Sequence, residues 1–174
     1  MDFWQVIRAR HMVRDFDPNQ EISEALVTGL LSAAIEAPSA GNCQSWHFVV
    51  VRRAAVRAEL AQAAGGQSFV AEAPVVIVVC ADPARSAQRY RERGRTLYTY
   101  QDTAAATQNL LLAATDLGLG ACWVGAFDTE GVSRALALPD GLIPVAMVPV
   151  GFPLQPSQRT TTRRDLSEVT TYIE

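Results

Sequence analysis

Residues 102–117 constrain the fold more than any other stretch, because a helix built from them would be apolar on almost every face. Alanines fill positions 104–106, leucines fill positions 110–112, and Gly118 follows. Alanine and leucine favour a helix, and glycine commonly ends one. A helix that is apolar nearly all round must be covered on all sides. We therefore predict that Asp102 begins the longest helix and that this helix lies in the core or in an interface between subunits.

Apolar runs rich in β-branched residues predict the strands of a sheet. Residues 75–80 are typical of a central strand, and residues 48–51 predict a second buried strand. Residues 121–124 and 145–150 predict two more. Each run is short and bounded by turn residues, so strands are favoured over further helices.

Capping and breaking residues predict the remaining helices. Asp2, Ser23 and Asp128 each precede an amphipathic segment, and Pro38 ends the second of these. Residues 54–64 predict a helix ended by two glycines. Helices and strands are interspersed, so we predict an α+β or α/β fold, with a sheet under helical cover. Because there is no repeat or linker, residues 1–174 are predicted to form one domain.

Two segments have weaker patterns. Residues 83–101 carry five arginines among polar residues and end in two tyrosines, which predicts a surface helix or a flexible cover. A solvated face is the favoured interpretation of this arginine run. The tail, residues 160–174, carries Arg163 and Arg164 and ends in a weak strand pattern at residues 169–173.

The charged and reactive residues exclude several classes of protein. The net charge of −3 argues against nucleic-acid binding, and the absence of lysine excludes Schiff-base chemistry. The three cysteines form no C-x-x-C pattern, which is typical of a cytosolic chain with reduced thiols. His11 and His47 are too few and too far apart to predict a zinc site. Without a signal-peptide pattern or a membrane-spanning apolar run, we expect a soluble, cytoplasmic protein.

The loop at residues 37–48 is the strongest candidate for a binding site. Small residues fill its first half, and Asn42, Gln44 and Trp46 follow in close succession. Small residues allow a backbone to approach a flat ligand, and amides supply both donors and acceptors. We therefore expect this loop to bind a planar heterocycle.

Two other catalytic patterns are weaker than they first look. Glycines at 118, 120 and 125 follow a predicted helix and precede a strand, which is the reverse of a dinucleotide-binding fingerprint. Cys43 and His47 are four residues apart, but no third residue is placed to orient the histidine, which is predicted to be a half-buried strand residue. A cysteine hydrolase therefore stays a minor alternative.

Arginines at the two ends of the chain predict a phosphate site. Arg10 and Arg14 lie near the N-terminus, whereas Arg163 and Arg164 lie near the C-terminus. A phosphate monoester needs two or three fixed guanidinium donors, and the termini of a domain often lie close together. Each pair alone is more often a solvated surface pair.

Taken together, these segments resemble the FMN-dependent nitroreductase family. The matching pieces occur in the order that the family has and span nearly the whole chain. They are residues 10–16, 37–48, 102–112, 117–127, 150–153 and 163–166. The loop at 37–48 is the most specific piece, and the terminal arginines are the least specific.

The resemblance implies an α+β fold with a mostly antiparallel central sheet flanked by helices. It also implies an obligate homodimer that binds two FMN molecules at the subunit interface, with the long apolar helix as a main dimer element. The cofactor contacts that it implies are Arg10, His11, Met12, Arg14, Pro38, Ser39, Ala40, Asn42, Gln67, Trp123, Val124, Gly125, Ala126, Arg163 and Arg164.

These implied contacts divide between the two subunits. Arg10 and Arg163, with Arg164, would hold the FMN phosphate, and Arg14 would lie nearer the ring. The loop residues from Pro38 to Asn42 would line the ring of the partner's flavin. Many members have a serine where this chain has Met12, so one hydroxyl contact to the flavin is absent.

The implied chemistry is ping-pong electron transfer from NADH or NADPH through FMN to a nitroaromatic, a quinone or a similar small acceptor. The cofactor does this chemistry, so no catalytic side chain and no metal is expected. Alternatives within the same fold are a dehalogenase, a flavin-cleaving enzyme and a flavin-binding protein without turnover. The physiological acceptor and the preference between NADH and NADPH stay open.

Overall fold

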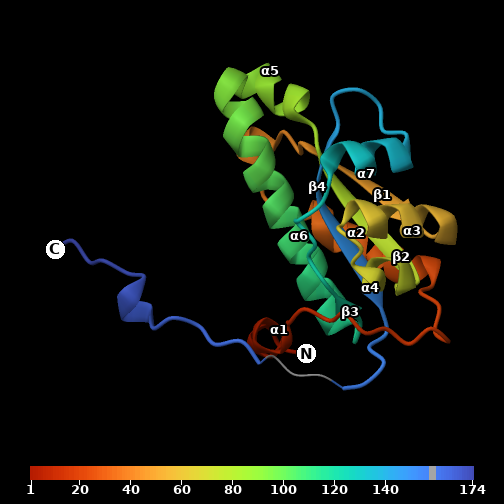
Figure 1. The fold of residues 1–174 in the computed structure, drawn as a ribbon. Helices are drawn as coiled ribbons and strands as arrows, with labels where there is room; N and C mark the ends of the chain where they lie inside the picture. Colours follow the sequence, from red (N-terminus) through yellow and green to blue (C-terminus); the bar gives the residue numbers. More distant parts are fainter. Residues whose placement is uncertain (157–159) are drawn as a thin grey trace.

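A four-stranded sheet forms the centre of the molecule, in a computed structural model that describes residues 1–156 and 160–174 (Figure 1). Its spatial order is β1-β2-β4-β3, and every neighbouring pair is antiparallel. The strands are β1 (Trp46–Val51), β2 (Val75–Ala81), β3 (Gly120–Ala121) and β4 (Ile143–Gly151). The antiparallel sheet and its helices confirm the α+β class.

Side-chain caps begin four of the helices. Asp2, Ser23 and Asp128 accept hydrogen bonds from backbone N–H groups of the first turn, as their sequence positions predict, and Asp82 does so as well. The helices are α1 (Phe3–Ala9), α2 (Glu24–Ile35), α3 (Ala54–Ala63), α4 (Ser68–Glu72), α5 (Pro83–Arg93), α6 (Thr99–Asp116) and α7 (Thr129–Leu136).

Strand β2 divides the core into two layers, because successive side chains of a strand point to opposite faces. Its odd-numbered residues from Val75 to Val79 pack toward α2 and α6. Its even-numbered residues from Val76 to Cys80 pack toward α3, α4 and α7. All of β2 is buried, so the predicted central strand is confirmed.

Strand β1 corrects one prediction. It was expected to be buried, but only Val51 of this strand is buried, and His47 is exposed rather than half-buried. The reason is its place at the edge of the sheet, where β2 is its one partner among the described residues. An apolar run therefore identified the strand without locating it in the sheet.

The longest helix begins earlier than predicted. Helix α6 starts at Thr99, and a π-helical turn, η2 (Gly94–Tyr98), connects it to α5. Asp102 is buried inside α6 and does not cap it. Its carboxylate accepts hydrogen bonds from a distant loop, whereas a cap would accept them from its own first turn. Gly118, with a φ of 73°, follows the helix end as predicted.

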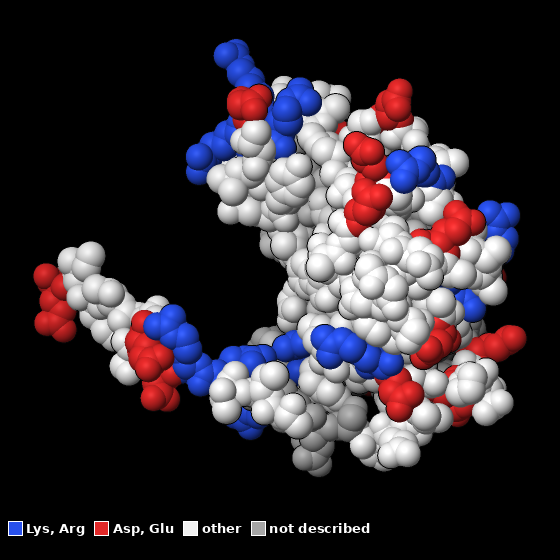
Figure 2. Space-filling model, in the orientation of Figure 1, with Lys and Arg blue, Asp and Glu red and all other residues white. Residues whose placement is uncertain are grey.

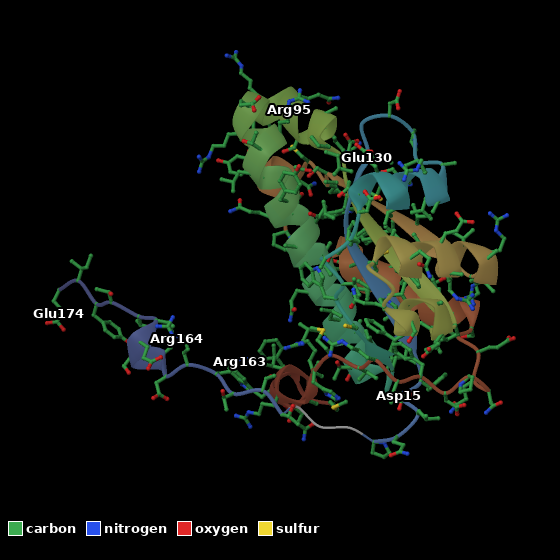
Figure 3. The ribbon with its side chains drawn as sticks, in the orientation of Figure 1. Asp15, Arg95, Glu130, Arg163, Arg164 and Glu174 are labelled. Carbon is green, nitrogen blue, oxygen red and sulfur yellow. The ribbon has the colours of Figure 1, made fainter. Side chains whose placement is uncertain are left out.

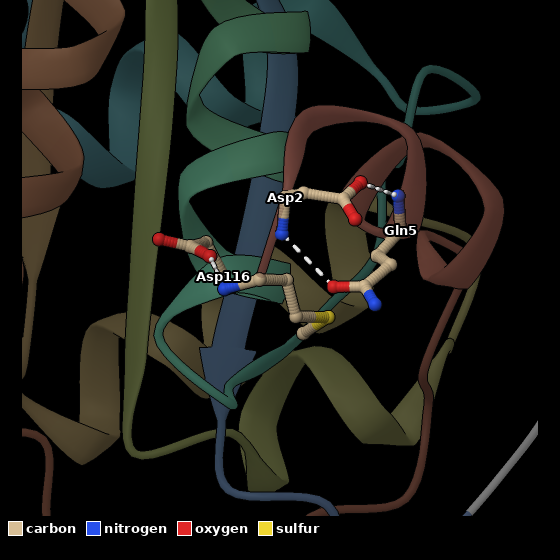
Figure 4. Close-up of polar contacts among 4 residues, drawn as sticks. Asp2, Gln5 and Asp116 are labelled. Carbon is tan, nitrogen blue, oxygen red and sulfur yellow. Dashed lines mark hydrogen bonds and ion pairs between the residues drawn. The ribbon is translucent and has the colours of Figure 1, made fainter.

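The N-terminus contacts the C-terminal end of α6 (Figure 4). The Met1 ammonium group lies 2.7 Å from the Asp116 carboxylate. Asp2 and Gln5 form a capping box at the start of α1, with both hydrogen bonds 2.9 Å long. These contacts fix α1, and with it the arginine-bearing segment that follows.

The C-terminal tail extends away from the body of the molecule (Figure 1). Its described part contains one short helical turn, η3 (Leu166–Glu168), and the strand pattern at residues 169–173 does not form a strand. No sheet edge is paired with this segment, since β3 and β1 end the sheet. Its apolar side chains are consequently open to solvent, with Tyr172 80% and Ile173 95% exposed. Among the described helices, none is long and apolar enough to cross a membrane.

Candidate functional site

The loop at residues 39–45 is tightly wound. Gly41, Asn42 and Gln44 have φ angles of 52°, 56° and 51°, a left-handed conformation that glycine and asparagine adopt most readily. The Gln44 backbone N–H donates to Ser39 Oγ at 2.9 Å, and the Gln44 side-chain amide donates to Asn42 Oδ1 at 3.2 Å. The two amides that the sequence singled out therefore lie together on the surface of the loop.

A buried carboxylate fastens this loop to α6. Asp102 is 4% exposed. Its two oxygens accept hydrogen bonds from the Ala40 backbone N–H at 2.9 Å and from Ser45 Oγ at 2.8 Å. Sequence reasoning missed this role, because both partners lie more than fifty residues away along the chain. Asp102 thereby positions two residues that flank the predicted heterocycle-binding face.

Two arginines of α5 fasten the same loop from the other side. Arg85 Nε donates to the Cys43 carbonyl at 2.5 Å, and Arg89 Nη1 donates to the Gly41 carbonyl at 2.9 Å. A Cβ atom on Gly41 would lie 2.5 Å from the Tyr90 hydroxyl and, at a φ of 52°, would strain the backbone, so a larger residue would have to displace the Tyr90 or Arg89 side chain. The loop is thus enclosed by α5 and α6.

Arginines from both ends of the chain meet in a second region. The pocket there has a volume of about 270 Å³ and is lined by Arg10, His11, Met12, Arg14, Thr160, Thr161 and Arg163. Three guanidinium groups and two threonine hydroxyls suit a phosphate, and none of the described residues that line the pocket carries a carboxylate. Arg164 is not among the lining residues, because its guanidinium is paired with Glu168 Oε2 at 3.1 Å.

The floor of this arginine pocket is tied to the sheet. The Val13 N–H donates to the Ala121 carbonyl at 3.0 Å, and the Trp123 N–H donates to the Met12 sulfur at 3.2 Å. A Cβ atom on Gly120 would lie 2.6 Å from the Val13 side chain, so glycine allows the close approach. Met12, at the position where the resemblance implies a missing hydroxyl contact to the flavin, thus accepts a backbone hydrogen bond.

The segment after β3 leaves the sheet earlier than the predicted strand at 121–124. Regular pairing covers Gly120 and Ala121, and Val124 makes an isolated bridge to Met147. Trp123 is half-buried, and the Val124 side chain points into the core. Gly125 and Ala126 are exposed. Val124 can therefore contact a cofactor only through its backbone.

Arg14 also contacts residues below the pocket. Its guanidinium lies 5.8 Å from the centre of the Phe69 ring. Burial raises the pKa of the Cys122 thiol, and the positive charge of Arg14 acts in the opposite direction.

Gln67, two residues before Phe69, was predicted to contact the flavin, and its side-chain amide donates to the Ala64 carbonyl at 2.9 Å. No group of residues able to hold a metal ion occurs in the described parts of the chain.

The loop and the arginine pocket lie at opposite ends of α6. The loop is bonded to Asp102 in the first turns, whereas the N-terminal segment is bonded to Asp116 in the last turn. Fourteen residues of helix, from 102 to 116, span roughly 21 Å. Figure 3 shows Arg163 near one end of the molecule and Arg95, which follows α5, near the other. A single chain therefore does not bring the two predicted halves of the site together.

The chain is similar to proteins of known family. The sequence profile of the nitroreductase family matches residues 7–72 and 63–152. A protein of Methanothermobacter thermautotrophicus, whose name contains the words NADH dehydrogenase/NAD(P)H nitroreductase, is 34% identical over 159 residues, covering 89% of this chain and 79% of that protein. The FMN reductase (NADPH) of Bacillus subtilis is 28% identical over 162 residues, covering 86% of this chain and 65% of that protein.

A solved structure supports the same assignment. The crystal structure of a nitroreductase family protein from Streptococcus pneumoniae TIGR4 superposes with a TM-score of 0.88 at 26% identity, over 99% of this chain and 100% of that one. Since the family profile matches well over half of the sequence, the chain belongs to the nitroreductase family of NAD(P)H oxidoreductases.

Proposed function

We propose that the chain, as one domain, binds FMN and uses it to transfer electrons in a ping-pong reaction from NADH or NADPH to a nitroaromatic, a quinone or a similar small acceptor. The arginine pocket carries this proposal, because three guanidinium groups from opposite ends of the sequence converge there. Their donors match the oxygens of a phosphate monoester. When bound, the flavin supplies the redox chemistry, and the protein supplies binding and orientation.

The residues of the chain would act on the cofactor in distinct ways. Arg10 and Arg163 would hold the phosphate, and Thr160 and Thr161 add hydroxyl donors beside them. Arg14, held against Phe69, would place a positive charge nearer the ring. The backbone of residues 123–126 would pass along one side of the ring, as in the sequence-based expectation.

A visible absorption spectrum of the purified protein tests the proposal directly. We expect a yellow protein whose flavin bands bleach under NADH or NADPH and return when a quinone is added. A protein that stays colourless after incubation with FMN would contradict it. Arg10→Ala should weaken FMN binding about tenfold or more, because a charge-assisted contact to phosphate is lost. Arg93→Ala, on α5, should leave FMN binding unchanged.

We further propose that the active form is a homodimer in which each site combines the arginine pocket of one subunit with the loop of the other. The distance between the two regions along α6 supports this arrangement. An apolar surface supports it as well, because Phe3, which lines a hollow with residues of α6, is 66% exposed and its neighbour Trp4 is 62% exposed. Large exposed apolar groups of this kind commonly mark an interface. The extended tail offers further apolar surface to a partner.

Co-expression of two inactive variants tests this arrangement. Arg10→Ala damages the pocket, and Ala40→Trp obstructs the loop. In a mixed dimer with shared sites, one of the two sites combines an intact pocket with an intact loop. We expect about a quarter of the wild-type activity from a random mixture, because half of the dimers are mixed. If each site lies within one subunit, both sites of the mixed dimer are damaged and no activity returns.

A further inference from the structure

An arginine-rich surface on α5 and η2 is not used by the proposed flavin site. It consists of Arg85, Arg89, Arg91, Arg93 and Arg95, all exposed, in a chain of net charge −3. Figure 2 shows these positive groups gathered at one end of the molecule. Within the described residues, Arg95 has an ion-pair partner, Glu92 at 3.9 Å, and the other four have none. Such a cluster produces a local positive field that attracts anions.

This surface is rigidly built. Arg91 has a φ of 50°, and η2 folds back against α5 after it. A Cβ atom on Gly94 would lie 2.5 Å from the Ser86 carbonyl oxygen, so glycine permits the close packing. The Tyr90 and Tyr98 rings meet edge to face at 5.0 Å, and Arg93 Nε donates to the Tyr98 hydroxyl at 2.9 Å. The arginines of α5 therefore project from a fixed element.

Arg85 and Arg89 differ from the other arginines of this surface in their position. Each donates one hydrogen bond to a carbonyl of the loop at residues 41–43. A guanidinium group has five N–H donors in a planar fork, so most of the donors of each are left for a ligand. Their charges stand beside the loop that is proposed to line the flavin ring.

We infer that Arg85 and Arg89 bind a phosphate group of the nicotinamide dinucleotide donor. The inference rests on the proposed function, which assigns the FMN phosphate to the arginine pocket at the other end of α6. The donor brings its own phosphates: a pyrophosphate in both NADH and NADPH, and a 2′-phosphate in NADPH alone. Two arginines fixed next to the ring-lining loop supply positive charge and N–H donors for such a group.

Calorimetric titration with NADP⁺ and with NAD⁺ tests the inference without relying on turnover. The double variant Arg85→Gln/Arg89→Gln should bind NADP⁺ about tenfold more weakly than the wild type, the effect of losing a charge-assisted phosphate contact. The KM for NADPH should rise by a similar factor while kcat changes little. Arg134→Gln, an exposed arginine on α7, is the matched control and should change neither value. Because the contact is electrostatic, salt should weaken binding to the wild type more than to the double variant.

The outcomes separate the two sources of phosphate. Weaker binding of NADP⁺ alone assigns the 2′-phosphate, and equally weaker binding of NADP⁺ and NAD⁺ assigns the pyrophosphate. Unchanged binding of both would overturn the inference, as would a wild-type protein that binds neither. A protein that binds NADP⁺ through these arginines but takes up no FMN would instead refute the proposed function.

A variant that keeps the charge separates ligand binding from support of the loop. Arg85→Lys/Arg89→Lys retains both cations but loses the planar fork that contacts the loop carbonyls. We expect it to recover most of the affinity for NADP⁺. If the lysine and glutamine variants lose affinity equally, and FMN binding falls in parallel, the arginines act through the loop alone and the inference is wrong.

Discussion

The loop at residues 39–45 and the arginine pocket are held in place by different kinds of contact. The loop is enclosed by its own chain: a buried carboxylate bonds it from α6, and two guanidinium groups bond it from α5. The pocket takes part of its lining from Thr160, Thr161 and Arg163, where the chain leaves the body of the molecule. The shape of the loop is thus fixed by contacts within the body of its own chain, whereas the shape of the pocket depends on where the tail lies.

Among the substitutions that test this difference, removal of the Asp102 carboxylate should lower the free energy of unfolding most. Asp102→Ala leaves the buried Ser45 hydroxyl and the half-buried Ala40 N–H without their partner. We expect the free energy of unfolding to fall by about 3 kcal/mol, as for hydrogen bonds to a buried charge. Urea unfolding followed by circular dichroism measures the loss. Asp116→Ala removes an exposed carboxylate from the same helix and serves as the control.

A second substitution shows whether the loss comes from unpaired groups. Adding Ser45→Ala to Asp102→Ala removes one of the two orphaned donors, so the double variant should lose less than the sum of the single changes. Strict additivity would mean that the carboxylate and the hydroxyl do not interact, and the loop would then be held mainly by α5.

Local sequence signals predicted much of the fold but not this support. Asp2, Ser23 and Asp128 were recognisable because a cap acts within three residues of its own position. Asp102 was mistaken for a cap, since its true partners come close only when α6 packs against the loop. Strand β1 was recognised from its composition, but its place at the sheet edge depends on pairing that no local pattern encodes.

The arginines show the same limit. Residue type and position suggested a phosphate site at the two ends of the chain only in combination with the family resemblance, and the structure brings Arg10, Arg14 and Arg163 into one pocket. Neighbouring residues of an extended segment point in different directions, so only one of Arg163 and Arg164 can face the pocket. The sequence does not show which one, because that depends on how the segment lies in the fold. The family resemblance already implied that the loop and the pocket of one chain serve different flavins, but the placement of the two regions at opposite ends of α6 emerges only from the fold.

The second prediction uses this difference between neighbouring arginines. Arg163→Ala should weaken FMN binding about tenfold, because it removes one of the three guanidinium groups of the pocket. Arg164→Ala should have little effect, because Arg164 is paired with Glu168 outside the pocket. Quenching of FMN fluorescence measures both affinities. Equal losses would show that the tail moves on binding and that the pocket is formed differently in the complex.

The third prediction concerns pH and two buried thiols. Burial raises the pKa of Cys80 to about 12, and it also raises the pKa of Cys122 beneath the arginine pocket. In the unfolded chain a thiol loses its proton near pH 8.5. Between that pH and the folded pKa, the unfolded state binds fewer protons, so stability falls as pH rises. In this range Cys80 should lower the free energy of unfolding by about 1.4 kcal/mol per pH unit, and Cys122 should add to the decrease.

Alanine variants assign this slope to its sources. Cys80→Ala should remove the contribution of the β2 thiol to the fall in stability with pH. Cys122→Ala should remove a smaller contribution, since Arg14 opposes the effect of burial on the Cys122 thiol. Arg14→Ala should steepen the slope, because the charge that favours the Cys122 thiolate is gone. If all three variants show the same dependence of stability on pH as the wild type, groups other than these thiols control alkaline unfolding.

The smallest effect is expected at Met12, where an uncharged hydrogen bond to sulfur, rather than a buried charge, connects the floor of the pocket to the sheet. Met12→Leu keeps the volume but removes the sulfur that accepts the Trp123 N–H. Since sulfur is a weak acceptor, we expect the free energy of unfolding to fall by less than about 1 kcal/mol. Met147→Leu, fully buried in the sheet, changes packing alone and is the control. If Met12→Leu costs no more than Met147→Leu, the sulfur contributes nothing, and the floor depends on the Val13–Ala121 hydrogen bond.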